Sequence, residues 1–131
     1  GLALAQDSKS LADYRAEAEA AVDGVNVEES MRLKENDAIV FVDIRDSAEV
    51  EKSGKVASAV HVPRGMLEFF IDPDSPMHNK LFQTKKQIVF YCATGGRSLL
   101  AAKLAQDMGI ENATFLEGGY KAWSKADGAT E

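Results

Sequence analysis

One cysteine stands where the sequence is best suited to nucleophilic chemistry. Cys92 directly follows the apolar run at 88–91, and it is followed by Ala93, Thr94, Gly95, Gly96, Arg97 and Ser98. The apolar run predicts a buried strand, and ligand sites of parallel sheets lie at the carboxyl ends of strands. The two glycines allow a tight turn whose N–H groups point inward at an anion. A helix expected over 98–108 turns its positive end to the same point.

These dipoles favour the thiolate form of Cys92. Together with the nearby Arg97, they predict a thiol pKa below the usual value of about 8.5. The loop therefore suits a sulfur nucleophile, an anion or both. The plain alternative is a buried, unreactive cysteine at an ordinary strand–helix turn, since cysteine is among the most buried residue types. That alternative leaves the two glycines, the arginine and the helix start unexplained.

Two charged residues follow another apolar run, at 38–42. Asp43 and Arg45 lie just past the end of this predicted strand, where functional side chains collect. We expect them to support the site as a buried ion pair, or through hydrogen bonds that anchor neighbouring loops.

The remaining pattern alternates helices with short apolar strands. Helical spacing and capping residues indicate helices over 11–22, 26–36, 46–54, 66–71, 98–108 and just after 118–119; apolar runs indicate strands at 38–42, 59–62, 88–91 and 113–116. Residues 72–79, with two prolines, are a predicted loop. Such alternation predicts an α/β fold, a mainly parallel central sheet flanked by helices, with an extra N-terminal helix.

Length and charge narrow the function classes. A chain of 131 residues predicts one domain, with a disordered start at 1–9, a helix at 10–24, the main domain at 25–126 and a C-terminal tail at 127–131. The net charge of −6 lacks the basic footprint of a nucleic-acid-binding protein. No apolar run approaches the roughly 20 residues of a membrane span. A single cysteine excludes zinc sites with several thiolates, and no metal is expected.

The loop at 92–98 resembles the active-site loop of rhodanese-type sulfurtransferases, which reads Cys-x-x-Gly-x-Arg-Ser. Three further segments are similar to motifs of that family in the same order: 42–49, 54–63 and 116–123. The resemblance covers roughly 25–125 and implies a single rhodanese-like domain. This chain departs from the family pattern with Lys55 in place of His, His61 in place of Asn, and Ala93 in place of a polar or cationic residue.

The resemblance also implies an activity. A sulfane sulfur would move from a donor, such as thiosulfate or a persulfide, to a nucleophilic acceptor through a persulfide on Cys92. Residues 93–98 would bind the anion, and no cofactor is needed. The partners are then a small-molecule donor and a thiol or cyanide acceptor, with a protein sulfur acceptor as a further option and neither nucleic acid nor membrane. Because the loop itself offers only Arg97 as a cation, we expect a high KM for thiosulfate and a glutathione-type or protein persulfide as donor.

Three alternatives stay open at this point. Cysteine-based phosphatases and arsenate reductases use a similar loop, but the phosphatases place five residues between Cys and Arg, whereas this chain has four. A second alternative is a non-catalytic module that binds a protein partner, and a third is a sulfur carrier. The lone thiol suggests the cytoplasm, while small residues at 2–6 weakly resemble the end of a secretory signal and leave a periplasmic or secreted location open.

Overall fold

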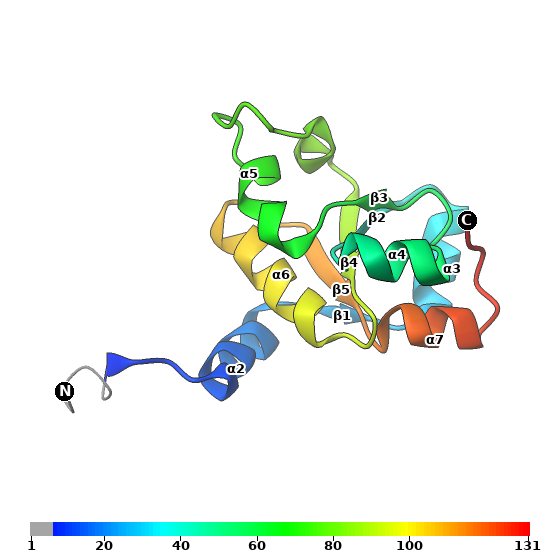
Figure 1. Ribbon diagram of the computed structural model, residues 1–131, viewed down its shortest axis with the longest axis horizontal. Helices are drawn as coiled ribbons and strands as arrows, with labels where there is room; N and C mark the ends of the chain where they lie inside the picture. Colours follow the sequence, from blue (N-terminus) through cyan, green and yellow to red (C-terminus); the bar gives the residue numbers. More distant parts are fainter. Residues whose placement is uncertain (1–6) are drawn as a thin grey trace.

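The computed structural model describes residues 7–131. A parallel sheet forms the centre of the molecule (Figure 1). Its five strands lie in the order β1-β5-β4-β2-β3, and all neighbouring strands are parallel. The strands are β1 (Gly24–Val25), β2 (Ile39–Asp43), β3 (Val60–His61), β4 (Gln87–Tyr91) and β5 (Ala113–Leu116). The predicted α/β class with a mainly parallel sheet is confirmed. Most of the segment expected to be disordered, 1–9, lies outside the described residues.

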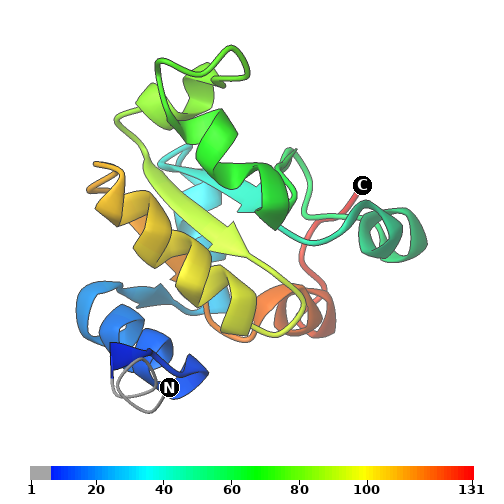
Figure 2. The ribbon, with the colours of Figure 1, turned by 60° about the vertical axis from the view of Figure 1, so that its left-hand side comes forward.

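Helices cover both faces of the sheet. The helices are α2 (Leu11–Ala21), α3 (Val27–Glu35), α4 (Ser47–Ser53), α5 (Leu67–Ile71), α6 (Gly96–Asp107) and α7 (Gly119–Lys125), with two 3-10 turns, η1 (Arg64–Met66) and η2 (Lys80–Gln83). One core cluster joins α2, α5 and α6 to the sheet, and another joins α3 and α7 to its opposite face. Figure 2 shows α6 beside β4, and α5 packs against α6.

Side chains along β4 point alternately to the two faces of the sheet. Ile88 and Phe90 belong to the core on the α6 side, while Val89 and Tyr91 belong to the core on the α7 side. This is the period of two that a strand imposes. The next residue, Cys92, continues the alternation and turns toward α6.

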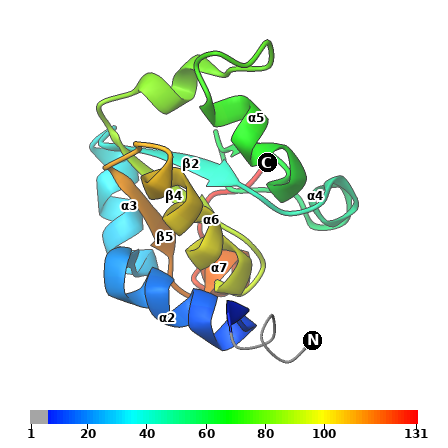
Figure 3. The same cartoon turned by 90° about the vertical axis from the view of Figure 1, so that its left-hand side faces the viewer.

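The extra N-terminal helix is present as α2, and it packs against α6 (Figure 3). Ser10 begins it, accepting a hydrogen bond from the Asp13 amide while the Asp13 carboxylate accepts one from the Ser10 amide. Asn26 begins α3 in the same way, by accepting from the Glu29 amide at 2.8 Å. Both starts lie where the capping residues predict them.

Several elements differ from the prediction. The pairing of Gly24 with Phe115 adds the strand β1, and two residues are too few to show any periodicity. The 3-10 turns η1 and η2 were not expected, and α6 begins at Gly96 instead of Ser98. The segment at 72–79 is a loop, as predicted.

The C-terminal segment is tied to the domain by backbone hydrogen bonds. The amide of Lys55 donates to the Glu131 carbonyl at 3.0 Å, and the amide of Ala57 donates to the Ala129 carbonyl at 3.0 Å. Within 7–131, no helix is long and apolar enough to cross a membrane.

Candidate active site

Cys92 lies at the carboxyl end of β4, the central strand of the sheet. The neighbouring chain after β2 is held to it, because the Ile44 amide donates to the Tyr91 carbonyl at 3.0 Å. Cys92 itself is 1% exposed. A reactant must therefore enter the loop to reach the thiol, which does not project from the surface.

The loop after Cys92 points hydrogen-bond donors at the sulfur. The Gly95 amide donates to Cys92 Sγ at 3.1 Å, and Gly95 has a φ of +115°, a conformation that glycine adopts without steric cost. Ser98 Oγ lies 3.5 Å from the same sulfur and 3.1 Å from the Gly95 carbonyl oxygen. A hydroxyl has one proton to donate. When the thiol ionises, the Ser98 hydroxyl can turn that proton from the carbonyl to the thiolate.

The surroundings of Cys92 lower its pKa, although two effects oppose each other. Burial disfavours the charged thiolate and raises the pKa. The Ser98 hydroxyl and the backbone N–H groups of Ser98, Gly95 and Thr94 stabilise the thiolate, and together they bring the pKa below its ordinary value. The thiol is thus prepared as a nucleophile by neutral donors in the loop.

Arg97 is held by a carboxylate from another helix. Its Nη1 and Nη2 donate to Glu49 Oε1 and Oε2 at 2.7 and 2.9 Å. The guanidinium lowers the pKa of Glu49 to about 2, and Glu49 in turn raises the pKa of Arg97. The sequence predicts that Arg97 helps to ionise Cys92. In the structure much of its charge is offset by Glu49, whose role beyond capping α4 the sequence does not reveal.

The start of α7 supports the loop from behind. The amides of Tyr120 and Lys121 donate to the carbonyls of Cys92 and Ala93 at 2.8 and 3.1 Å. Gly119, with φ of +62°, makes this approach possible, because a Cβ there would lie 2.6 Å from the Cys92 carbonyl oxygen. The signal in the sequence is the glycine pair at 118–119, which predicts a turn but not this contact.

Asp43 and Arg45 form a buried ion pair. Arg45 is 2% exposed, and its Nη2 lies 2.6 Å from Asp43 Oδ2. The same guanidinium donates to Ser53 Oγ at 2.9 Å and to the Gly54 carbonyl at 2.6 Å. The pair thereby anchors the end of α4, the helix that supplies Glu49.

Two residues that depart from the family pattern make local hydrogen bonds. Lys55 Nζ donates to the Ala59 carbonyl at 2.8 Å and pairs with the Glu131 carboxylate at 2.6 Å. His61 Nε2 lies 2.7 Å from the Arg45 carbonyl oxygen. Both side chains therefore brace the segment around β3.

A hollow of about 230 Å³ adjoins the loop, between α4 and α7. We call it the loop-side hollow; its lining comprises Arg45, Glu49, Lys52, Ser53, Ala93, Thr94, Tyr120 and Lys121. Sequence reasoning missed Lys52 and Lys121, because they come from two helices that only the fold brings together.

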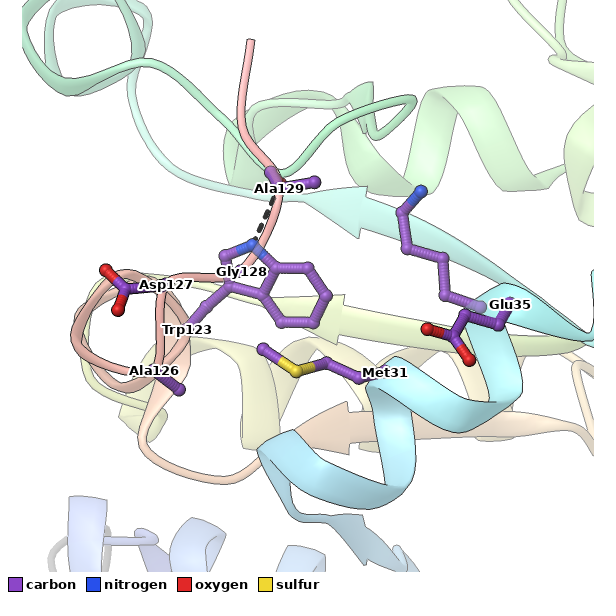
Figure 4. Close-up of a pocket in the computed structure, with 8 residues that line it drawn as sticks. Met31, Glu35, Trp123, Ala126, Asp127, Gly128 and Ala129 are labelled. Atoms are coloured by element: carbon purple, nitrogen blue, oxygen red, sulfur yellow. Dashed lines mark hydrogen bonds between the residues drawn. The ribbon is translucent and has the colours of Figure 1, made fainter.

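A second hollow lies between α3 and the C-terminal end of α7 (Figure 4). Its volume is about 330 Å³, and its lining includes Met31, Glu35 and Trp123 but no residue of the loop at 92–98. The Trp123 indole already donates to the Ala129 carbonyl at 2.9 Å. The candidate site is therefore the loop, where hydrogen-bond donors surround the Cys92 thiol.

The chain belongs to the Rhodanese-like domain family, whose model matches residues 26–126. It is 26% identical over 95 residues to a rhodanese domain-containing protein of Drosophila melanogaster, covering 69% of this chain and 86% of that protein. It is 27% identical over 96 residues to a sulfurtransferase of Allochromatium vinosum, covering 73% of this chain and 81% of the relative. The resemblance seen in the sequence is confirmed.

Solved structures share the fold. A Rhodopseudomonas palustris protein of unknown function, described as a possible tyrosine phosphatase, is 42% identical with a TM-score of 0.89, over 95% of this chain and 96% of that one. A human single-domain sulfurtransferase is 24% identical with a TM-score of 0.67, over 79% of this chain and 96% of its own.

Proposed function

We propose that the protein is a sulfurtransferase that carries sulfane sulfur on Cys92. The observation that supports this most strongly is the environment of Cys92 Sγ. A buried sulfur with a lowered pKa accepts a hydrogen bond from Gly95 and lies beside the Ser98 hydroxyl. These groups stabilise an anionic sulfur at Cys92, and we expect the N–H groups of the same loop to stabilise the terminal sulfur of a persulfide.

The first half-reaction loads the cysteine. The Cys92 thiolate attacks the outer sulfur of a donor such as thiosulfate. A new S–S bond forms at Cys92, the S–S bond of thiosulfate breaks, and sulfite leaves with the electron pair. The loop N–H groups then stabilise the negative terminal sulfur, because they are fixed before the reaction begins.

The second half-reaction returns the enzyme to its starting state. A nucleophilic acceptor, cyanide or a thiolate, attacks the terminal sulfur of the persulfide. The bond from that sulfur to Cys92 breaks, and the Cys92 thiolate leaves with the electron pair. Two half-reactions through one covalent intermediate give ping-pong kinetics.

The names of relatives support this class of donor and acceptor. A human thiosulfate:glutathione sulfurtransferase is 29% identical over 87 residues, covering 62% of this chain and 75% of that protein. A mitochondrial thiosulfate sulfurtransferase of Saccharomyces cerevisiae is 29% identical over 99 residues, covering 72% of this chain and 66% of its own length. Thiosulfate and glutathione are therefore the first donor and acceptor to test.

A phosphatase is the second candidate, because the similar protein of Rhodopseudomonas palustris is described as a possible one. The loop argues against it. Four residues separate Cys92 from Arg97, and a ring of N–H groups around a tetrahedral phosphate needs a wider turn. In addition, the Arg97 guanidinium is occupied by Glu49.

A side-by-side assay separates the candidates. Wild-type and Cys92→Ser proteins are given thiosulfate with cyanide, thiosulfate with glutathione, and p-nitrophenyl phosphate. We expect thiocyanate or sulfite from the wild type alone, and no release of p-nitrophenol. Phosphate-ester hydrolysis that depends on Cys92, without sulfur transfer, would favour the phosphatase. Loading of Cys92 with sulfur but no turnover would favour a carrier.

A further inference from the structure

The loop-side hollow has a lysine on each wall. Lys52 comes from α4 and Lys121 from α7, and both side chains are exposed. Neither lysine has a carboxylate partner among residues 7–131, whereas Lys55 and Lys103 are each paired with one. The hollow is also lined by Ala93 and Thr94, the two residues that follow Cys92 in the chain.

The other cations around this hollow are already neutralised. Arg45 is paired with Asp43 at 2.6 Å, and the Glu49 carboxylate is occupied by Arg97. In the described lining, this leaves Lys52 and Lys121 with charge available to an incoming anion. The protein as a whole carries −6 and repels anions. A local pair of free ammonium groups at the site therefore changes the potential that an anionic substrate meets there.

The fold also ties together the two helix segments that carry these lysines. The Tyr120 hydroxyl, next to Lys121 in the chain, donates to the carbonyl of Ser53, next to Lys52, at 2.7 Å. The Arg45 guanidinium stacks 4.3 Å from the Tyr120 ring centre and donates to Ser53 Oγ at 2.9 Å. The backbone on both walls is thus tied together before any ligand arrives, which reduces the entropy lost on binding.

We propose that Lys52 and Lys121 bind the oxyanion end of the substrate while its sulfur lies at Cys92. The oxyanion is the sulfonate of thiosulfate or a carboxylate of a thiol acceptor, and either chemistry suits an ammonium pair. This inference rests on the proposed function and deepens it. It adds two cations from outside the loop to Arg97, the one cation that the loop itself offers.

The kinetic test compares Lys52→Gln, Lys121→Gln and the double variant with the wild type. Lys125→Gln is the matched control, because Lys125 is an exposed lysine of α7 that does not line the hollow. With cyanide as acceptor, we expect KM for thiosulfate to rise about threefold in each single variant and about tenfold in the double variant, as exposed ion pairs typically contribute. The dependence of KM on ionic strength should weaken in parallel.

The acceptor arm separates the two sources of the oxyanion. Two acceptors are compared at saturating thiosulfate: glutathione, which carries carboxylates, and 2-mercaptoethanol, which carries none. If the lysines bind the acceptor, KM for glutathione rises in the double variant more than KM for 2-mercaptoethanol does. If they bind the donor, only the thiosulfate arm responds. Equal kinetics of the double variant and Lys125→Gln with both anionic substrates would overturn the inference and leave the proposed function standing.

A binding measurement keeps the inference separate from turnover. Thiosulfate is titrated calorimetrically into Cys92→Ser protein, with and without the two lysine substitutions. Weaker binding without the lysines supports the inference even if the wild type transfers no sulfur, in which case the proposed function alone has failed. Thiosulfate binding that does not depend on the two lysines, or no thiosulfate binding at all, rules out the donor as their ligand, and the same result in a titration with glutathione overturns the inference as a whole.

Discussion

Glu49 accepts hydrogen bonds from both terminal nitrogens of Arg97, at 2.7 and 2.9 Å. This contact joins the first turn of α4 to the first turn of α6. The same carboxylate also accepts from the Asp46 amide at 3.3 Å, at the start of α4. Arg97, in the loop at 92–98, is therefore oriented by a glutamate that lies 48 residues earlier in the chain.

The Glu49–Arg97 pair should make the free energy of unfolding depend on pH. The folded protein lowers the pKa of Glu49 from 4.5 to about 2. A depressed pKa stabilises the fold above the ordinary value, and this stabilisation is lost as pH falls from about 4.5 to about 2. Because both side chains are partly exposed, we expect a contribution of about 1 kcal/mol or less.

Urea unfolding at pH 7 and pH 3 measures this effect. The wild type should lose more unfolding free energy between the two pH values than Glu49→Gln does. Glu51→Gln, an exposed neighbour on α4, is the control and should behave like the wild type. Identical pH dependence for Glu49→Gln and the wild type would show that the pair contributes nothing.

The Ser98 hydroxyl should set part of the acidity of Cys92. Its removal in Ser98→Ala takes away a hydrogen bond that stabilises the thiolate, so the pKa of Cys92 should rise. Iodoacetamide alkylation across pH measures the midpoint, which we expect below about 8.5 in the wild type. Arg97→Ala should raise the midpoint less, since its charge is offset by Glu49. A midpoint in Ser98→Ala at or below that of the wild type would contradict this assignment.

Gly119 should be intolerant of any side chain. In Gly119→Ala the new Cβ would lie 2.6 Å from the Cys92 carbonyl oxygen, and the φ of +62° adds strain. We expect a loss of about 1–3 kcal/mol in unfolding free energy and a fall in sulfur transfer, because α7 must move off the loop. Gly109→Ala is the control, since it also has positive φ but no atom within 4 Å of its Cβ. Equal activity in the two variants would count against the supporting role of α7.

Loop length should decide the chemistry. One glycine inserted between Gly95 and Gly96 gives the five-residue spacing of phosphatases. It should displace the Gly95 amide from Cys92 Sγ, which it now meets at 3.1 Å. Loss of one such donor lowers turnover on the order of 100-fold in comparable sites. A glycine inserted between Met77 and His78, in the loop at 72–79, is the control. Undiminished sulfur transfer with the longer loop would show that the length of the loop does not determine the activity.

Local pattern predicts the central strands and the capped helices of this fold, but not the two-residue edge strand β1. The apolar runs at 38–42 and 88–91 are long enough to indicate buried strands, and the parallel-sheet rule then brings Cys92 to the ligand-binding edge. The two-residue strand β1 has no pattern of its own and exists because β5 offers it a free edge.

The contacts that complete the candidate site are tertiary. Glu49 has the spacing of a helix cap, and nothing nearby in sequence indicates that Arg97 will meet it. Lys52 and Lys121 look like ordinary surface lysines until α4 and α7 face each other across the loop-side hollow. Likewise, only the approach of α7 to the Cys92 carbonyl explains why position 119 must be a glycine.

Intact-mass spectrometry after exposure to thiosulfate or glutathione persulfide tests the central claim most directly. The wild type should gain the mass of one sulfur atom, lose it again when cyanide is added, and release thiocyanate in equal amount. Folded Cys92→Ser protein should show neither the gain nor the thiocyanate. A wild-type protein that never gains sulfur, or a Cys92→Ser protein that turns over like the wild type, would contradict sulfur transfer through Cys92.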